Sequence, residues 1–452
     1  MVNKSPWTLQ LIRNRELKRL KHNEETDIVI VGGGIAGLTN AFFILENTDL
    51  RVTVIEAGKV AHGATGHNAG QVVMYLERSF ESIVKEFGIE MAKDGQKDII
   101  SSWKLLKHIH KKIKAHTHLS EFTGYAGLST KNQLKEHLDN MLLMKKAGIK
   151  MEGMLIAKEY LQNHKLDDKY YSLYKIVPKN KILNLIESDN ENYIASIYGK
   201  KGLINSAIFT EEISQYLVKK YPNRLNIYEE SPVKKIVLHS DISETFSRKR
   251  IISKKIILCT NGFHNIKIIN KAGKNINSKF HKNVKGEIGY MAGYLEEFKK
   301  DPLAVSYFTR KEKITNTGEV YFYLTRRTYH KKDKAYNLIC IGGPQIALKK
   351  KMKYNEKTHK YPEKSKEDIN KFLRENYKHN SQDRVDFHYL WHGLMGYTKG
   401  MLRMVGQDPY NPNLIYNLGC NGAGILTSIY GSNKVSLILK GKKFKPSIFD
   451  IR

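Results

Sequence analysis

The stretch Asp27–Glu56 constrains the fold of this 452-residue chain more than any other part of its sequence. An apolar run leads into a glycine pattern, Gly32-Gly33-Gly34-Ile35-Ala36-Gly37, and a helix-like stretch follows it. A second apolar run, Val52–Ile55, then ends in an acid, Glu56. This order of strand, glycine turn, helix, strand and acid is typical of the βαβ unit that binds an adenine dinucleotide.

Each part of this unit has its own physical role. Gly32 allows the tight turn that leaves the strand, Gly34 removes a side chain that would block a pyrophosphate, and Gly37 lets the helix pack close to the strand. The helix N-terminus offers N–H groups and the positive end of its dipole to the phosphates. An acid such as Glu56 takes the ribose hydroxyls. The sequence therefore predicts dinucleotide contacts from Gly32, Gly34, Ile35, Ala36, Gly37, Glu56 and Ala57.

Two other interpretations of this stretch stay open on its residues alone. The glycines can form the turn of a βαβ unit that binds no nucleotide. The run Ile28–Leu45 contains no charged residue, and it is close to the shortest length that crosses a membrane. Four glycines placed for phosphate binding, together with Asn40 inside the run, favour the nucleotide site over a membrane span.

The net charge of the chain does not identify what the protein binds. Lys+Arg number 76 against 45 Asp+Glu, which gives a net charge of +31. Such a charge suits nucleic acid, a membrane surface or an anionic substrate. The basic residues are spread along the chain rather than gathered in a tail. This distribution favours a general bias in amino-acid composition over a nucleic-acid partner as the cause of the charge. A hydrophobic content of 41% and a charged content of 27% indicate a globular protein.

The cysteines and histidines give no support to a metal site. Cys259, Cys340 and Cys420 lie far apart and form no CxxC pair, so we expect a reducing, cytoplasmic location and neither zinc nor a redox dithiol. The histidines between 108 and 118 are not spaced to share one helix face, and a solvated basic face explains them better. Residues 1–25 lack a signal-peptide layout, and we expect an N-terminal extension lying on the first domain.

The order of segments predicts an α/β fold. The pattern of residues 202–221 predicts a turn and an amphipathic helix. Alternating polarity from Val284 to Pro344 indicates an antiparallel sheet. Nucleotide-fold pieces therefore occur at the start, middle and end, with a β-rich layer between them. The sequence predicts a Rossmann-type domain of separate segments with an inserted mixed, largely antiparallel β substrate domain. The expected boundaries are 1–25 for the extension, 26–100, 202–265 and 385–445 for the nucleotide domain, and 101–201 and 266–384 for the substrate domain.

Three further motifs narrow the cofactor. They are the loop Ala64-Thr65-Gly66-His67-Asn68-Ala69-Gly70-Gln71, the strand end Leu258-Cys259-Thr260-Asn261-Gly262, and Trp391-His392-Gly393-Leu394 followed by the glycine-rich Gly419–Leu426. With them the chain resembles, over most of its length, the FAD-dependent oxidoreductases of the D-amino-acid oxidase superfamily, which include glycine oxidase, sarcosine oxidase and γ-glutamylputrescine oxidoreductase. The resemblance implies FAD and a glutathione-reductase-like FAD-binding domain.

The resemblance also implies which residues lie beside the flavin. In the family the last glycine-rich turn places a helix N-terminus by the pyrimidine ring, where N–H groups stabilise the negative charge of a reduced flavin. Beyond the first motif, the FAD contacts implied are Thr65, Gly66, His67, Asn68, Gln71, Val233, Thr260, Asn261, Gly262, Gly422, Ala423, Gly424 and Ile425.

The sequence departs from the family near the flavin. The family element T-P-D-x-x-P reads Tyr397-Thr398-Lys399-Gly400-Met401-Leu402-Arg403 here, without the acid or the prolines. Met395 occupies the neighbourhood of the cysteine that tethers the flavin in sarcosine-oxidase-like members, so that link is not expected. His67 stands where dimethylglycine-dehydrogenase-like members carry a tethering histidine, although an uncharged, non-covalent contact is the simpler role.

The activity implied by the resemblance is oxidation of a C–N bond in a small amine or amino acid. A hydride passes to flavin N5, and the resulting imine hydrolyses, while oxygen or another acceptor takes the electrons. Oxidation of a 2-hydroxy acid or a polyol phosphate is one alternative. A tRNA-modifying aminomethyl oxidase is another, and it would suit the positive charge.

The candidate substrate contacts come from the β-rich layer and from the stretch before the last strand. Tyr323, Arg326, Arg327 and Arg403 are chosen because an Arg fork binds a carboxylate in two parallel hydrogen bonds and a Tyr hydroxyl steadies it. Arg326 and Arg327 can equally be solvated hairpin residues. A cation at Lys285 would assist oxygen activation near N5, with a surface lysine as the alternative.

Overall fold

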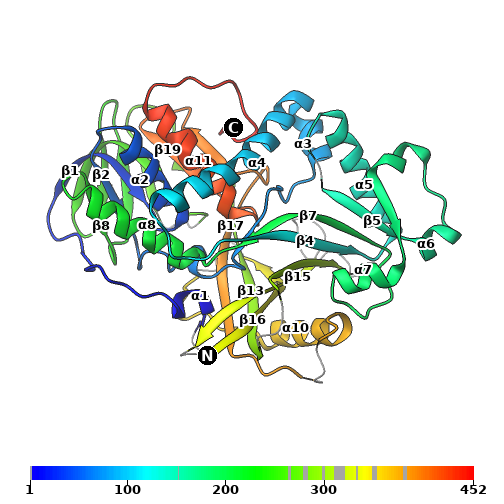
Figure 1. The fold of residues 1–452 in the computed structure, drawn as a ribbon. Helices are drawn as coiled ribbons and strands as arrows, with labels where there is room; N and C mark the ends of the chain where they lie inside the picture. Colours follow the sequence, from blue (N-terminus) through cyan, green and yellow to red (C-terminus); the bar gives the residue numbers. More distant parts are fainter. Residues whose placement is uncertain are drawn as a thin grey trace.

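The computed structural model describes residues 3–150, 152–262, 266–277, 283–297, 301–309, 321–331, 334–348, 354–379 and 384–451. Its strands form two large mixed sheets with helices packed on them (Figure 1). The predicted α/β class is confirmed.

The first sheet contains the predicted βαβ unit. Its strand order is β12-β9-β10-β11-β1-β2-β8, with β19 beside β11 and β18 beside β19. The pairs β1–β11, β1–β2, β2–β8 and β11–β19 are parallel, and β2 is buried along its whole length, as apolar strands of parallel sheets are. Its strands are β1 (Glu24–Val31), β2 (Val52–Ile55), β8 (Leu225–Tyr228), β9 (Lys235–Leu238), β10 (Ser243–Phe246), β11 (Arg250–Leu258), β12 (Lys267–Asn270), β18 (Met404–Gln407) and β19 (Leu414–Leu418).

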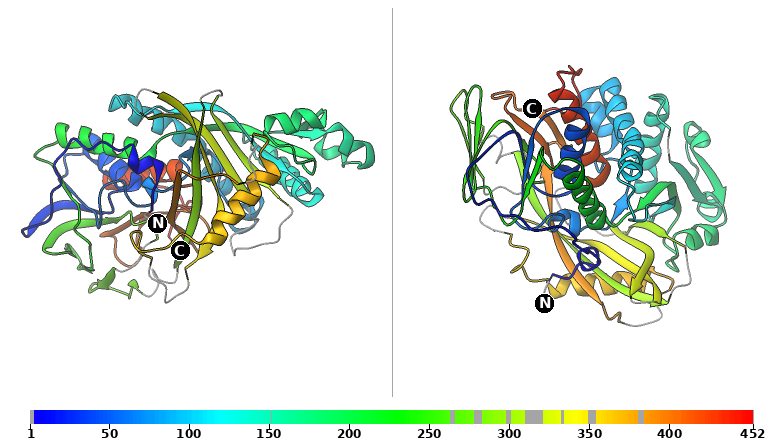
Figure 2. Two further views of the ribbon diagram at one scale, coloured as in Figure 1. Left: turned by 90° about the horizontal axis from the view of Figure 1, so that it is seen from below. Right: turned by 60° about the vertical axis from the view of Figure 1, so that its left-hand side comes forward.

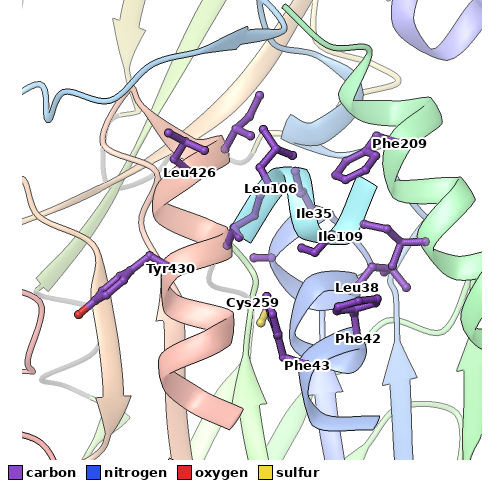
Figure 3. Packing of buried hydrophobic residues seen from close by; sticks show 14 of the residues in the cluster. Ile35, Leu38, Phe42, Phe43, Leu106, Ile109, Phe209, Cys259, Leu426 and Tyr430 are labelled. Carbon is purple, nitrogen blue, oxygen red and sulfur yellow. The ribbon is translucent and has the colours of Figure 1, made fainter. Parts of the chain in front are cut away.

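Helix α2 (Ile35–Asn47) lies at the centre of the layer that covers this sheet. It packs against α8 (Ser206–Lys220) and α11 (Gly424–Leu439), and α4 (Ile89–Lys112) packs against α11. Figure 3 shows Leu38 and Phe42 of α2 among side chains of α4, α8 and α11. Every residue of α2 from Ile35 to Leu45 is buried, which explains the uncharged run in the sequence. Among the described residues, no helix has both the length and the apolar character needed to cross a membrane.

The second sheet confirms the antiparallel pattern predicted after residue 284, as far as that stretch is described. Its order is β17-β13-β16-β15-β14-β4-β7-β5-β6, with β3 beside β7, and only β14–β4 and β5–β6 are parallel among the described pairs. The strands are β3 (Gln71–Val72), β4 (Ser120–Leu128), β5 (Gly153–Ala157), β6 (Tyr174–Val177), β7 (Ala195–Leu203), β13 (Val284–Glu297), β14 (Leu303–Phe308), β15 (Tyr321–Lys331), β16 (Lys334–Ala347) and β17 (Tyr389–Thr398).

Helices α3 to α7 connect strands of the second sheet, and α10 packs on it (Figure 2). Helix α10 packs on β16 and β13, and the ring of its Phe372 stacks on Phe322 of β15 with the centroids 4.4 Å apart. The other helices are α1 (Pro6–Leu9), α3 (Phe80–Phe87), α5 (Lys131–Lys146), α6 (Lys158–Asn163), α7 (Lys179–Leu185), α10 (Glu363–Asn376) and the 3₁₀ turns η1 (Ala64–Gly66) and η2 (Asp168–Leu173).

The N-terminal segment contacts both sheets. Arg15 forms ion pairs with Glu211 (2.7 Å) and Glu229 (2.6 Å), which belong to the α8–β8 side of the first sheet. Trp7 is fully buried and meets Trp391 of β17 edge to face, with ring centroids 6.3 Å apart. The N-terminal segment therefore contacts the first sheet through Arg15 and the second sheet through Trp7. The predicted domain boundaries stay a prediction, and β17, placed with the nucleotide domain by sequence, pairs with β13 in the second sheet.

Candidate active site

A cavity of about 680 Å³ is lined by residues of both sheets. Its wall is built from the turn after β1, the loop of residues 63–71, the end of β11, strands β13, β15 and β17, and the start of α11. The motifs that lie hundreds of residues apart in the sequence are thus brought to one space.

The turn after β1 requires glycine at its first position. Gly32 has a φ of +112°, and a Cβ there would lie 2.7 Å from the carbonyl oxygen of Cys259. A Cβ on Gly37 would overlap the carbonyl oxygen of Gly32, so this glycine allows the close helix–strand packing that the sequence predicted. A Cβ on Gly34 would lie 2.9 Å from Thr65 Oγ1, in the space between the helix start and the 63–71 loop.

Glu56 is held in place at the cavity wall by backbone donors. The N–H of Gly33 donates to Oε2 (2.6 Å) and the N–H of Gly58 donates to Oε1 (2.8 Å). Burial raises the pKa of the Glu56 carboxyl, and these two hydrogen bonds oppose the rise. Each carboxylate oxygen keeps acceptor capacity, which a pair of ribose hydroxyls can use.

The loop of residues 63–71 is shaped by its own hydrogen bonds. The Ile35 N–H donates to Thr65 Oγ1 (2.9 Å), which joins the loop to the start of α2. The Asn68 side chain donates to the Thr65 carbonyl (2.9 Å) and accepts from the Gly70 N–H (2.6 Å). The Trp7 indole N–H donates to the Asn68 carbonyl, so the N-terminal segment also holds this loop. The ring of His67 faces the cavity, with Nδ1 3.0 Å from the Gly63 carbonyl oxygen.

Helix α11 begins at the opposite part of the cavity. Gly422, with a φ of +86°, leads into Gly424, and no side chain caps the helix N-terminus. Asn261 fixes this turn: its Oδ1 accepts from the Cys420 N–H (2.9 Å) and its Nδ2 donates to the Leu394 carbonyl (3.2 Å). The uncapped helix start presents the positive end of the helix dipole to the cavity.

Four tyrosines and a glutamate form the wall beside this helix start. We call them the Tyr–Glu wall, and they are Tyr75, Glu77, Tyr321, Tyr323 and Tyr397. The Tyr321 hydroxyl donates to Glu77 Oε1 (3.0 Å), and the rings of Tyr321 and Tyr323 lie 6.0 Å apart. A Cβ on Gly422 would lie 2.6 Å from Glu77 Cγ, so Glu77 packs directly against the turn that opens α11.

Burial dominates the protonation of the Tyr–Glu wall. It raises the pKa of the Glu77 carboxyl, although the hydrogen bond from Tyr321 and the charge of Lys201 oppose it. Burial also raises the pKa values of the Tyr321 and Tyr323 hydroxyls, with the charge of Glu77 as the next cause. The tyrosines are therefore neutral donors at any physiological pH.

Sequence reasoning missed Tyr75, Glu77, Tyr321 and Tyr397 as site residues. A signal for two of them was present, because Gln71, Val73, Tyr75 and Glu77 alternate and all four line the cavity. Side chains at every second residue of an extended segment share one face. An extended segment leaving the 63–71 loop would therefore have carried Tyr75 and Glu77 into the site with the predicted Gln71.

Comparison with known proteins identifies the family. The model of the FAD dependent oxidoreductase family, abbreviated DAO, matches residues 27–433, which is most of the chain. The chain belongs to the FAD-dependent oxidoreductase family. FAD is therefore its cofactor, as the sequence motifs predicted.

Relatives of this FAD-dependent oxidoreductase differ in substrate. The γ-glutamylputrescine oxidoreductase of Escherichia coli (strain K12) is 37% identical over 67 residues, 15% of this chain and 16% of that protein. Matches cover no more than 16% of the length of the first two curated relatives. The glycine oxidase structure from Geobacillus kaustophilus has a TM-score of 0.64 at 13% identity, covering 95% of this chain and 99% of that one. An L-α-glycerophosphate oxidase from Mycoplasma pneumoniae with FAD bound has a TM-score of 0.62 at 13% identity, with the same coverage. At these identities the two structures establish the fold alone.

The cavity of this FAD-dependent oxidoreductase fits FAD by its shape and donors. Because residue 34 is glycine, no side chain fills the space between the start of α2 and Thr65. The N-termini of two helices, α2 and α11, line the cavity. Two of the predicted FAD contacts, Gly37 and Gly66, do not line it. Those that do are Gly32, Gly34, Ile35, Ala36, Glu56, Ala57, Thr65, His67, Asn68, Gln71, Val233, Thr260, Asn261, Gly262, Gly422, Ala423, Gly424 and Ile425.

The predicted arginine fork for a substrate carboxylate needs correction. Arg327 is absent from the cavity wall: its guanidinium donates to the carbonyls of Ala69 (2.8 Å) and Ile204 (3.2 Å) and lies 4.2 Å from the centre of a Trp7 ring. Burial lowers its pKa to about 10. Arg327 braces the N-terminal segment and the 63–71 loop, because both of its terminal NH₂ groups donate to backbone carbonyls and its guanidinium does not reach the cavity wall.

The other predicted cations are also engaged or remote. Arg326 is buried and forms a two-point ion pair with Glu187 (2.6 and 2.9 Å). It is therefore neither a solvated hairpin residue nor a residue of the cavity wall. Arg403 lines the cavity, yet its guanidinium donates to Asn417 Oδ1 (2.6 Å) and to the Asn417 carbonyl (2.9 Å). Lys285 is exposed on β13 and does not line the cavity. Of the predicted catalytic residues, Tyr323 and Arg403 line the cavity, and only Tyr323 belongs to the Tyr–Glu wall.

Proposed function

We propose that this protein oxidises a C–N bond of a small amine or amino acid with FAD as the electron acceptor. The observation that carries the proposal is the Tyr–Glu wall beside the start of α11, where a proton acceptor, Glu77, and neutral tyrosine donors face the cavity. The likeness to γ-glutamylputrescine oxidoreductase over 67 residues supports a nitrogen substrate. Amines suit such a wall because they must lose a proton before the C–H bond breaks.

In this proposal the two ends of the cavity have separate tasks. The turn at Gly32–Ala36 holds the pyrophosphate, Glu56 holds the ribose, and the start of α11 stabilises negative charge on the flavin pyrimidine ring. Bound FAD supplies the acceptor for the hydride. The Tyr–Glu wall orients the substrate carbon, holds a proton at Glu77 and excludes water from the reacting atoms.

Two further predictions from the sequence are retained as proposals. The domain boundaries are retained with three changes, since β3 and β17 pair in the second sheet and β12 pairs in the first. A reducing, cytoplasmic environment is supported by three free cysteines, of which Cys259 and Cys340 are buried. Burial raises the pKa of both thiols to about 12, which makes them unreactive packing residues.

An anaerobic substrate screen tests the proposed function. The FAD-loaded protein is mixed with amines, amino acids, 2-hydroxy acids and glycerol 3-phosphate, and the visible absorbance of the flavin is followed. Bleaching by amines or amino acids supports C–N oxidation. Bleaching by hydroxy acids or glycerol 3-phosphate alone contradicts it and assigns C–O oxidation. Admission of oxygen then shows whether the reduced protein reoxidises at once, as an oxidase does.

A further inference from the structure

We infer that the substrate is an organic cation whose ammonium group binds to the Glu77 carboxylate among the tyrosines of the wall, and that it has no carboxylate on the carbon to be oxidised. This inference rests on the proposed function and narrows its substrate class from "amine or amino acid" to amines without an adjacent carboxylate. It is drawn from the charges around the cavity and from the placement of the arginines.

Three acids line the cavity, and they are Glu56, Glu77 and Glu356. Glu77 packs against Gly422, where α11 begins, whereas Glu56 lies with the glycine turn and Glu356 lies 3.6 Å from His67 Nε2. Tyr321 donates one hydrogen bond to Glu77 Oε1, and no ion pair of Glu77 is found among the described residues, although the charge of Lys201 acts on its carboxyl. A carboxylate with one neutral donor and unused acceptor sites is a natural partner for an ammonium group.

The charge balance around Glu77 favours one more positive charge. Lys201 of β7 is buried and lies near both Glu77 and Glu152, with its Nζ donating to the Tyr125 carbonyl (3.3 Å). Glu152 lines a second cavity of about 320 Å³ beyond it. Of these three groups only Lys201 is buried: Glu77 is half-buried beside the cavity, and Glu152 is exposed, so solvent screens its charge. A bound cation on the Glu77 side would give that carboxylate a direct partner.

The tyrosine rings supply the second half of a cation site. Tyr75, Tyr321, Tyr323 and Tyr397 line the cavity around Glu77, and Phe308 stacks on Tyr321 (5.1 Å between ring centres), which fixes the orientation of that ring. Aromatic faces attract alkylammonium groups through the ring quadrupole, most strongly where water is excluded.

The same wall is poorly suited to a carboxylate. An α-amino acid places its carboxylate one bond from the reacting carbon, and a guanidinium fork normally binds it. Here Arg326 is paired with Glu187, Arg327 is bonded to backbone carbonyls, and Arg403 is bonded to Asn417. At the reactive end of the cavity, a substrate carboxylate would therefore meet the negative charge of Glu77. Among the described residues there, it would find no guanidinium without a partner.

The chemistry balances with Glu77 as the proton acceptor. The ammonium of R–CH₂–NH₃⁺ binds to the Glu77 carboxylate and transfers one proton to it, which leaves the neutral amine. The C–H bond then breaks, the hydride with its electron pair passes to FAD, and the nitrogen lone pair forms the C=N bond of R–CH=NH₂⁺. Water later hydrolyses this product, and Glu77 returns its proton to solvent. The tyrosine hydroxyls stay protonated throughout.

The first test measures binding without turnover. The FAD-loaded protein is titrated with tetramethylammonium, n-butylamine, butyrate and both enantiomers of 2-aminobutyrate under anaerobic conditions, by flavin absorbance and by calorimetry. We expect the two cations to bind at least about tenfold more tightly than butyrate, and Glu77→Gln to abolish that preference. Glu152→Gln is the matched control, because it removes a carboxylate from the other side of Lys201, and it should preserve the preference.

The outcomes separate the two proposals. Tighter binding of butyrate or 2-aminobutyrate than of butylamine overturns the cation inference, as does an equal loss of cation binding in Glu152→Gln and Glu77→Gln. Bleaching by amino acids that is insensitive to Glu77→Gln overturns the inference and leaves C–N oxidation standing. Bleaching by hydroxy acids alone overturns the proposed function itself.

A pH titration of the unmodified protein avoids any dependence on variant folding. Tetramethylammonium does not titrate, so its affinity reports the site. The groups facing Glu77 are Tyr75, the hydroxyls of Tyr321 and Tyr323 on β15, Tyr397 on β17, and Lys201 on β7 with Glu152 behind it. Burial lowers the pKa of Lys201 to about 8, so it is charged below about pH 7, where the tyrosines are neutral. Below that pH the affinity should fall as Glu77 takes up a proton, and affinity that stays constant between about pH 7 and pH 4 overturns the inference.

Discussion

At the scale of single residues, the site depends on a few positions where one more carbon atom does not fit. Gly37 is the clearest case, because a Cβ there meets the backbone carbonyl of Gly32 rather than a movable side chain. Gly422 is comparable, with the Cβ directed at Glu77 and a left-handed φ of +86°. At both positions glycine brings an element of the cofactor site into place.

We expect Gly37→Ala to destabilise the protein by about 2 kcal/mol or more, because α2 must move away from β1 to relieve the overlap. The same shift should weaken FAD binding. The free energy of unfolding from denaturant titration and the FAD content after purification measure the two effects. Gly63→Ala is the matched control for stability alone, since a Cβ at Gly63 meets nothing within 4 Å although the residue lines the cavity. Equal stability of the two variants would contradict the packing role.

A second prediction at this scale concerns acid stability. The imidazole of His392 is buried, with Nδ1 2.9 Å from the Tyr354 hydroxyl and Nε2 3.1 Å from the His359 carbonyl oxygen. Burial, with the neighbouring His359 charge, lowers its pKa from 6.5 to about 4. A lowered pKa means that the stability contributed above pH 6.5 is lost as the pH falls through 4.

The measurement is the free energy of unfolding at several pH values between 7 and 4. The unmodified protein should lose up to about 3 kcal/mol from this histidine over that range, and His392→Gln should lose correspondingly less. Parallel curves for the two proteins would show that His392 does not carry the effect.

At the scale of elements, the N-terminal segment acts as a brace for the flavin loop. Trp7 lies between Trp391 of β17 and the guanidinium of Arg327, and its indole N–H reaches Asn68. Arg327 in turn holds the Ala69 carbonyl of the same loop. The loop of residues 63–71 is thus held by two residues, Trp7 and Arg327, that do not themselves line the cavity.

Trp7→Ala should therefore lower stability by about 3–5 kcal/mol and speed the release of FAD, because a large buried side chain and a loop contact are lost together. The rate of FAD release, followed by the recovery of its fluorescence, and the thermal midpoint are the readouts. Leu9→Ala on the same short helix is the control, since Leu9 is 58% exposed. Unchanged FAD release in Trp7→Ala would show that the loop does not need the brace.

The elements also show how far the sequence could predict the site. The glycine turn, the 63–71 loop and the α11 start could be located from the sequence because each is a short motif of neighbouring residues. The arginine fork was not, because Arg326 and Arg327 alternate on β15 and so point to opposite faces of the strand. Their partners Glu187 and Ala69 are distant in sequence, and only the register of the sheet decides which of them each arginine meets.

At the scale of the whole molecule, the fold class was predictable and the Tyr–Glu wall was not. Strand and helix periodicity indicate two layers, whereas Glu77 and Tyr321 meet only because the segment after β3 runs beside the start of β15. The site is a property of the joint arrangement of both sheets, since the glycine turn belongs to one and the wall mostly to the other.

Removal of FAD should therefore loosen distant segments together. We expect faster amide hydrogen exchange in residues 32–36, 63–71 and 419–425 of the protein without FAD, and a lower thermal midpoint that recovers with added FAD. Helix α5, which does not line the cavity, serves as the internal reference. A change confined to residues 32–36 would mean that the cavity does not act as one binding unit.

The burial of α2 by α11 has a consequence for how the protein is made. Helix α2 leaves the ribosome long before α11, which covers it. While the residues between them are made, a helix that is uncharged from Ile35 to Leu45 and buried in the folded protein lacks its final cover. A growing chain of this kind is a natural client for chaperones, and a premature stop codon before Gly424 would leave an aggregation-prone product rather than a smaller enzyme.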